Sequence, residues 1–196
     1  MIGKTYIHNR RSIRLSGYDY SQPDAYFITL CSQNHECLFG NVKDGEMVLN
    51  DPGRIVFDLW AWLAMQYGHV KLDEYVIMPN HLYGIIVITD CRGGSRTVPG
   101  GSRTAPTDIK RKPVGRLVGA FKTVSTKRMN EIRQTPGVKL WQRNYWEHIV
   151  RNEIELNRIR EYIQNNAAQW DHDKLNTEAL VGAVREPPLR VPEWFE

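Results

Sequence analysis

Residues 75–88 read YVIMPNHLYGIIVI, two apolar runs rich in β-branched residues that are separated by a Pro-Asn-His turn. Such runs predict two buried strands, or one bent strand, with the imidazole of His81 at the start of the second run. Side chains alternate across a strand, so His81 and Tyr83 share one face of the predicted sheet. Because a buried polar ring costs free energy unless it is paired, we expect His81 to have a functional role.

Strand and helix patterns alternate along the rest of the chain. The expected elements are a strand at 25–31, a hairpin of 37–42 and 46–49, a helix from 50 to about 67, strands at 69–78 and 82–88, a helix at 114–131, a strand at 141–150 and a helix from 152 to about 168. This order predicts an α+β fold, a ferredoxin-like sandwich in which helices back one face of a central antiparallel sheet.

The composition is typical of a globular protein with one sizeable core, since 41% of the 196 residues are hydrophobic and 24% are charged. We divide the chain into an N-terminal basic arm at 1–24, a domain at 25–170 and a C-terminal tail at 171–196. Within the domain, residues 91–112 are predicted to form a flexible basic loop. The tandem heptads GGSRTVP and GGSRTAP in this loop offer too little apolar surface to build a core.

Basic residues are segregated, although the net charge is only +4. Residues 1–18 hold four Lys or Arg and no acid, and residues 92–133 hold eleven against two acids. From Glu147 onward, acids outnumber bases ten to six. Such segregation indicates a surface that meets a polyanion such as nucleic acid; the alternative is a solvated helix face with a disordered tail.

The three cysteines are too few and too scattered for a disulfide framework or a zinc knuckle. We expect Cys31, Cys37 and Cys91 to be reduced thiols of a cytoplasmic protein. The first 20 residues lack an apolar core of signal-peptide length, and no apolar run reaches the length of a membrane span. We therefore expect no membrane partner.

The last predicted helix carries Tyr162 and Asn166 four residues apart, on the same helix face. Glu155 and Ile159 lie on that side as well, which places Tyr162 at the border between core and solvent. A tyrosine in such a position is usually an amphipathic rim residue, so helical spacing alone assigns it no chemistry.

Four segments, in order, resemble the REP-associated tyrosine transposases, a branch of the single-tyrosine transposase superfamily with a His-hydrophobic-His motif. The segments are RRSIRLSGYDYSQPDAYFITLC, VIMPNHLYGIIVI, GRLVGAFKTVSTKRMN and WQRNYWEHIVRNEIELNRIREYIQNN, which together span roughly residues 10–170. The resemblance implies the same ferredoxin-like fold, and a domain at 25–170 that nicks and rejoins single-stranded or hairpin DNA of REP type. It also implies that Tyr162 is the nucleophile and forms a 5′-phosphotyrosine intermediate.

The resemblance further implies a divalent metal, Mg²⁺ or Mn²⁺. His81 corresponds to the first motif histidine, and Asn166 to the ligand on the helix. The second motif histidine is expected at position 83, but this residue is Tyr83, and a phenol is a poor ligand for a divalent ion. Three alternatives remain open: a weak ion site that tolerates Tyr83, replacement of the missing histidine by His148, or a protein that binds nucleic acid without cutting it.

Binding of single-stranded or hairpin DNA requires a basic groove and aromatic side chains on which bases stack. We expect phosphate contacts from Arg10, Arg11, Arg14, Arg116, Lys122, Lys127 and Arg143. Trp141, Tyr145 and Trp146 could stack on bases, although their predicted strand position favours the core.

The resemblance also bears on assembly and location. It implies a monomer associated with the bacterial nucleoid in the cytoplasm; the alternative is a dimer that exchanges the tyrosine helix. The alternative function is a catalytically silent module of the same fold that holds hairpin nucleic acid.

Overall fold

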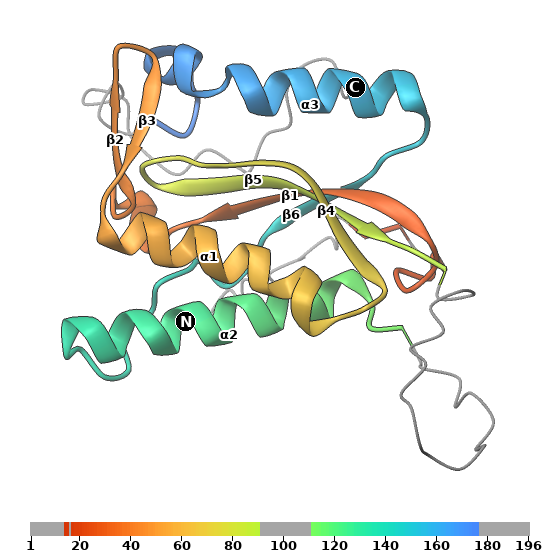
Figure 1. The fold of residues 1–196 in the computed structure, drawn as a ribbon, viewed down its shortest axis with the longest axis horizontal. Helices are drawn as coiled ribbons and strands as arrows, with labels where there is room; N and C mark the ends of the chain where they lie inside the picture. Colours follow the sequence, from red (N-terminus) through yellow and green to blue (C-terminus); the bar gives the residue numbers. More distant parts are fainter. Residues whose placement is uncertain (1–13, 16, 91–110, 177–196) are drawn as a thin grey trace, which may run out of the picture.

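A computed structural model gives the structure of residues 14–15, 17–90 and 111–176 (Figure 1). Arg10, Arg11, Cys91, most of the loop predicted at 91–112 and the tail from residue 177 lie outside the described residues. The elements are β1 (Asp24–Cys31), η1 (Gln33–His35), β2 (Gly40–Lys43), β3 (Glu46–Leu49), α1 (Asp51–Gln66), β4 (Val70–Ile77), β5 (His81–Ile88), α2 (Val114–Arg133), β6 (Trp146–Ile149), α3 (Glu153–Asn165) and η2 (Ala167–His172).

The central sheet has the strand order β4-β5-β1-β6, and every neighbouring pair is antiparallel. Helix α1 connects β1 to β4, and α2 connects β5 to β6, so the core follows the split β-α-β pattern of the ferredoxin-like fold. The short strands β2 and β3 form a separate hairpin. The predicted α+β class with a central antiparallel sheet is confirmed.

Helices cover both faces of this sheet, so the expectation that helices back one face is wrong for α3. Helices α1 and α2 pack on one face, and α3 packs on the other (Figure 1). The reason is visible in β1, where Tyr26 and Ile28 face α1 and α2 while Phe27 and Cys31 face α3. A strand that is apolar on both sides requires two covered faces.

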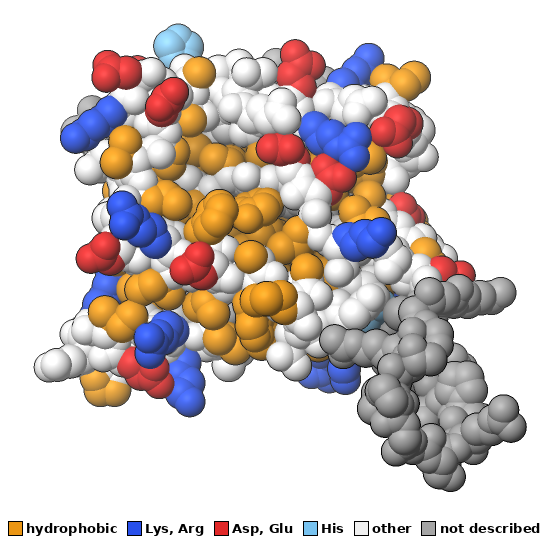
Figure 2. All heavy atoms as spheres, viewed as in Figure 1, with side chains coloured by type: hydrophobic (Ala, Val, Ile, Leu, Met, Phe, Trp, Pro, Cys, Tyr) orange, Lys and Arg blue, Asp and Glu red, His pale blue; other side chains and the backbone are white. Residues whose placement is uncertain are grey.

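Strand β4 forms one edge of the sheet, and this edge lies between α1 and α3. Figure 2 shows hydrophobic side chains gathered in this region, with basic and acidic side chains interspersed around them. Phe57 of α1 contributes to the exposed apolar surface and packs on Tyr75 of β4, with 5.3 Å between the ring centroids. None of the described helices combines the length and apolar character needed to cross a membrane.

Two predicted boundaries at the C-terminal end differ from the structure. The strand expected at 141–150 is reduced to β6. Trp141 forms only an isolated bridge with Ser32, and its indole N–H donates to Ser125 Oγ at 2.8 Å in the core between the sheet and α2. Helix α3 ends at Asn165, and η2 then turns back so that Trp170 is buried. Residues 171–176, which the sequence assigns to the tail, pack on the domain, since Leu175 and Asn176 are buried.

Candidate functional site

Three rings of the predicted site lie next to one another between β5 and α3. The hydroxyl of Tyr162 donates a hydrogen bond to the hydroxyl of Tyr83, with 3.1 Å between the oxygens. The ring centroids of Tyr83 and Tyr162 are 5.3 Å apart, and those of His81 and Tyr83 are 4.5 Å apart. The alternation along β5 therefore places His81 and Tyr83 on one face of the sheet, and both His81 and the tyrosine of α3 contact the ring of Tyr83.

An ion pair to β4 fixes the position of α3 above the sheet. Arg160 donates from Nε to Asp73 Oδ1 at 2.8 Å and from Nη2 to Asp73 Oδ2 at 2.7 Å. Asp73 lies where the register of β4 shifts between Leu72 and Tyr75, a bulge that redirects its side chain. The bidentate pair lowers the pKa of Asp73, mainly through the hydrogen bonds from Arg160.

The tautomer of His81 is set by Asn80. The amide nitrogen of Asn80 donates to the carbonyl oxygens of Leu175, at 2.7 Å, and His35, at 3.3 Å, so its oxygen must face the imidazole. This oxygen lies 2.8 Å from His81 Nδ1 and can only accept, which places the ring proton on Nδ1. The lone pair of Nε2 is therefore free to bind a cation, and this atom has no hydrogen-bond partner among the described residues.

The carboxylate of Asp173, which the sequence patterns did not identify as a site residue, lies beside this lone pair. Oδ2 of Asp173 is 3.8 Å from His81 Nε2 and accepts a hydrogen bond from Asn166 Nδ2 at 3.2 Å. The oxygen Oδ1 of Asn166 is buried and lacks a hydrogen-bond partner within the described part of the chain. His81 Nε2 and Asp173 Oδ2 thus lie near each other as two acceptors, with the Asn166 amide beside them at the end of α3.

Burial governs the protonation of the site. It lowers the pKa of His81 to about 4, although the nearby Asp173 carboxylate acts in the opposite direction. Burial also raises the pKa of Tyr83 well above its ordinary value and raises the pKa of Tyr162 to about 12. A neutral imidazole and two neutral phenols are therefore the resting forms at neutral pH.

Tyr162 is only partly buried, because it also lines a surface pocket of about 370 Å³. The other lining residues are Arg158, Glu161, Asn165 and Gln169. Arg158 precedes Tyr162 by one helical turn, so both project from the same side of α3. Its exposed guanidinium makes no hydrogen bond or ion pair with another described residue, and it can meet an anion that enters the pocket.

His148 lies away from this site. On β1, His81 is paired with Cys31 and His148 with Phe27, which separates the two residues by about 13 Å in the strand direction at roughly 3.3 Å per residue; they also lie on opposite sides of β1. His148 Nε2 is instead 2.8 Å from Glu155 Oε1, and its ring stacks on Trp146. The structure therefore does not bring His148 to the place of the missing motif histidine.

Two of the predicted phosphate contacts are engaged inside the protein. Arg14 donates from Nε to Glu147 at 2.5 Å and from Nη2 to the hydroxyl of Tyr145 at 2.6 Å. Lys122 donates to the backbone carbonyls of Gln142 and Asn144 at 2.9 and 3.0 Å, and burial lowers its pKa to about 8. The contacts of Arg14 hold the end of the N-terminal arm against β6, and those of Lys122 hold the segment before β6 against α2.

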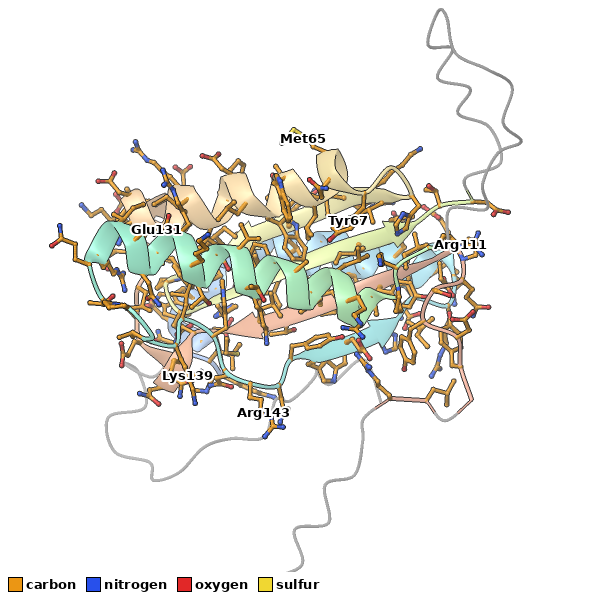
Figure 3. All side chains as sticks on the ribbon, turned by 90° about the horizontal axis from the view of Figure 1, so that it is seen from below. Met65, Tyr67, Arg111, Glu131, Lys139 and Arg143 are labelled. Atoms are coloured by element: carbon orange, nitrogen blue, oxygen red, sulfur yellow. The ribbon has the colours of Figure 1, made fainter. Side chains whose placement is uncertain are left out.

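The exposed cations of the predicted set lie on the side of the sheet opposite α3. Arg116 and Lys127 belong to α2, and Lys127 is 4.0 Å from Glu131 of the same helix. Figure 3, which looks toward α1 and α2, shows Arg143 pointing away from the body from the segment between α2 and β6. The basic helix and Tyr162 therefore do not line one common cleft.

Sequence reasoning missed three residues of the site, and their signals differ in strength. Arg158 could have been found from its spacing of four residues before Tyr162. Asn80 stands inside the strand motif, directly before His81. Asp173 has no local signal, because η2 brings it back to the sheet from beyond the predicted end of the domain at residue 170. No cluster of three or more His, Cys, Asp or Glu side chains suited to a metal occurs among the described residues.

Comparison with known proteins gives one relative at high identity. A Haemophilus influenzae protein, described as uncharacterized, is 42% identical over 174 residues, which cover 86% of this chain and 94% of the relative. No protein-family model matches the chain.

Two solved structures carry transposase descriptions. One is a REP-associated tyrosine transposase bound to a REP hairpin, with a TM-score of 0.48, 12% identity, and coverage of 81% of this chain and 73% of that chain. The other is a "putative transposase" from Deinococcus radiodurans, with a TM-score of 0.42, 16% identity, and coverage of 78% of this chain and 95% of that chain. The first description names the family that the sequence segments resemble.

Proposed function

We propose that this chain, which belongs to the same family as the Haemophilus influenzae protein, nicks and rejoins single-stranded or hairpin DNA through Tyr162. The observation that carries the proposal is the position of the Tyr162 hydroxyl, at the boundary between an open pocket and the buried pair of Tyr83 and His81. A phenol that is reachable from solvent and backed by a possible cation-binding group has the access that a nucleophile needs.

The proposed step is a transesterification at phosphorus. The Tyr162 oxygen bonds to the phosphorus of a phosphodiester, and the bond from phosphorus to the 3′ oxygen breaks. The phenol loses its proton to solvent, and the leaving 3′ oxygen takes up a proton from solvent to become a 3′-hydroxyl. The 5′-phosphotyrosine link conserves the energy of the broken bond, so attack by a 3′-hydroxyl reverses the step without ATP. When Tyr162 ionises, Tyr83 can donate to the phenolate, which lowers the pKa of Tyr162 against the effect of burial.

Arg158 and the pocket are proposed to receive the strand that carries the scissile phosphate. The guanidinium of Arg158 offers paired donors to phosphate oxygens. His81 Nε2 and Asn166 Oδ1 are buried acceptors without hydrogen-bond partners among the described residues, a donor set that suits Mg²⁺ or Mn²⁺. A bound ion would neutralise charge on the phosphate and favour in-line attack.

The test is formation of a covalent adduct. The full chain is incubated with Mn²⁺ and a labelled hairpin that carries a single-stranded 5′ extension, and protein–DNA adducts are resolved under denaturing conditions. Wild type is expected to form an adduct, and Tyr162→Phe to form none. Tyr67→Phe, which removes a hydroxyl at the end of α1 on the other side of the sheet, is the matched control. An adduct that survives in Tyr162→Phe would refute the assignment of the nucleophile.

One observation favours a second function, a silent module that binds hairpin DNA. The hydroxyl of Tyr83 occupies the hydrogen-bonding position next to Tyr162, where the motif would supply a metal-binding imidazole. Retained hairpin binding with no adduct in any divalent metal would select this alternative.

A further inference from the structure

We propose that Asp173 is a ligand of a divalent cation together with His81 and Asn166, and that its carboxylate replaces the histidine absent from position 83. The inference rests on the proposed function, because it completes the ion site at which the phosphate would be bound. It assigns a role to a residue that lies outside all four segments of the resemblance.

The first argument is the convergence of acceptor atoms. The Asn80 oxygen accepts a hydrogen bond from the Nδ1–H of His81, so Nε2 carries a lone pair and lies 3.8 Å from Asp173 Oδ2. The orientation of the Asn166 amide is set because its nitrogen donates to the same carboxylate oxygen, which leaves Oδ1 unpaired within the described residues. Two acceptors as close as His81 Nε2 and Asp173 Oδ2 in a buried space repel each other unless a cation lies between them.

The second argument is the charge of Asp173. Its side chain is only 5% exposed, and it has no Lys or Arg partner in the part of the chain that the structure describes. Buried carboxylates are paired with a cation or bind a metal, because an isolated buried charge costs too much free energy. A carboxylate in this position adds the negative charge that a neutral histidine would not supply.

The third argument is that Leu175 holds the Asp173 carboxylate in place, and that Leu175 is itself bound by Asn80, the residue that orients the imidazole. Asp173 Oδ1 accepts from the backbone N–H of Leu175 at 2.7 Å, and the carbonyl of Leu175 accepts from Asn80 at 2.7 Å. Asn80 therefore positions both His81 and Asp173. Outer contacts of this kind are what fix ligands around a metal ion.

The donor set and its spacing suit Mn²⁺ or Mg²⁺. An imidazole nitrogen, a carboxylate and an amide oxygen, completed by water, are ligands that Mn²⁺ accepts readily. Neighbouring ligands of an ion bound at about 2.1 Å lie roughly 3 to 3.5 Å apart, so His81 Nε2 and Asp173 Oδ2 would have to close by about 0.3 to 0.8 Å. Tyr83 is not part of the set, because its hydroxyl is hydrogen-bonded to Tyr162.

The test measures Mn²⁺ binding without DNA. The full chain is freed of metal and titrated with Mn²⁺, and the free ion is quantified from its electron paramagnetic resonance signal. Asp173→Asn keeps an oxygen for the Leu175 N–H but removes the charge, and it is expected to weaken binding about 10- to 100-fold or more. Asp171→Asn removes the same charge from an exposed position two residues away and is expected to bind like wild type.

The outcomes separate this inference from the proposed function. Wild-type affinity in Asp173→Asn, tighter binding in that variant, or no Mn²⁺ binding by wild type at millimolar concentration would each overturn the inference. Thermal unfolding in EDTA checks that Asp173→Asn is folded. Mn²⁺ binding that depends on Asp173, together with the absence of any DNA adduct, would refute the nicking function and leave the ion site standing.

Discussion

Asn80 connects two parts of the candidate site that are far apart in the sequence. It is fully buried, and its three side-chain contacts reach His81, Leu175 and His35. The Pro-Asn-His turn therefore does more than reverse the chain between β4 and β5. It fixes the imidazole and holds the segment after η2 against the sheet.

We predict that Asn80→Ala lowers the free energy of unfolding by about 2–4 kcal/mol, because each buried group left unpaired costs roughly 1–3 kcal/mol. Asn130→Ala, which removes an exposed hydrogen bond to the carbonyl of Val138, is expected to cost under about 1 kcal/mol. Urea unfolding of the two variants and wild type measures the difference. Equal losses in both variants would contradict a structural role for Asn80.

Substitution of Tyr83 tests whether the proposed ion site can be strengthened by a further ligand. We predict that Tyr83→His raises both Mn²⁺ affinity and the rate of adduct formation about tenfold, because it adds an imidazole next to His81. The smaller ring leaves space in the core and is expected to cost about 1–3 kcal/mol of stability. Adduct formation at fixed Mn²⁺ measures the gain. Tyr83→Phe removes the hydroxyl without adding a ligand, so a similar rise in that variant would exclude the explanation by metal binding.

Helix α3 carries Tyr162 and is tied to the sheet by the pair of Arg160 with Asp73. Because the pair lowers the pKa of Asp73 in the folded state, the folded state binds fewer protons near that pKa than the unfolded chain. The stability that the Arg160–Asp73 pair contributes is therefore complete above the unfolded pKa of about 3.9, and it is lost as the pH falls through the lowered pKa of the folded state.

We predict that Asp73→Asn lowers the free energy of unfolding by about 1 kcal/mol at pH 7, as expected for a charged pair that is partly exposed to solvent. The difference from wild type should shrink as the pH falls below about 4. Denaturant unfolding at several pH values measures both effects. Glu153→Gln is the matched control, since this exposed carboxylate also contacts Arg160, at 3.2 Å. A constant difference at all pH values would show that the charge of Asp73 is not responsible.

Local sequence patterns predicted the elements well and their arrangement less completely. Strand β5 and helix α1 follow from runs of apolar residues with periods of two and 3.6. The side of the sheet that α3 covers could not be predicted, because β1 is apolar on both faces and accepts a helix on either. The position of Asp173 could not be predicted either, because the turn through η2 has no periodic signal.

The sheet separates two surfaces that differ in chemistry. On the side of α3 lie Tyr162, the ring of Tyr83 and the pocket with Arg158. On the other side lie the cations of α2 and the network of Arg14 with Glu147. A bound hairpin that reaches Tyr162 must therefore approach over α3, and a strand that also contacts α2 must pass around an edge of the sheet.

This separation predicts which arginine contributes to binding of the reactive strand. We expect Arg158→Gln to reduce affinity for a single-stranded oligonucleotide and to lower the magnitude of the slope of log K against log salt by about 0.7, the value for one lost phosphate contact. Arg54→Gln removes an equal charge from the exposed surface of α1, across the sheet, and should leave the slope unchanged. Fluorescence anisotropy between about 50 and 200 mM salt resolves these slopes. If Arg54→Gln lowered the slope as much as Arg158→Gln, the strand would not be bound preferentially over α3, and the proposal that Tyr162 is the nucleophile would lose this support.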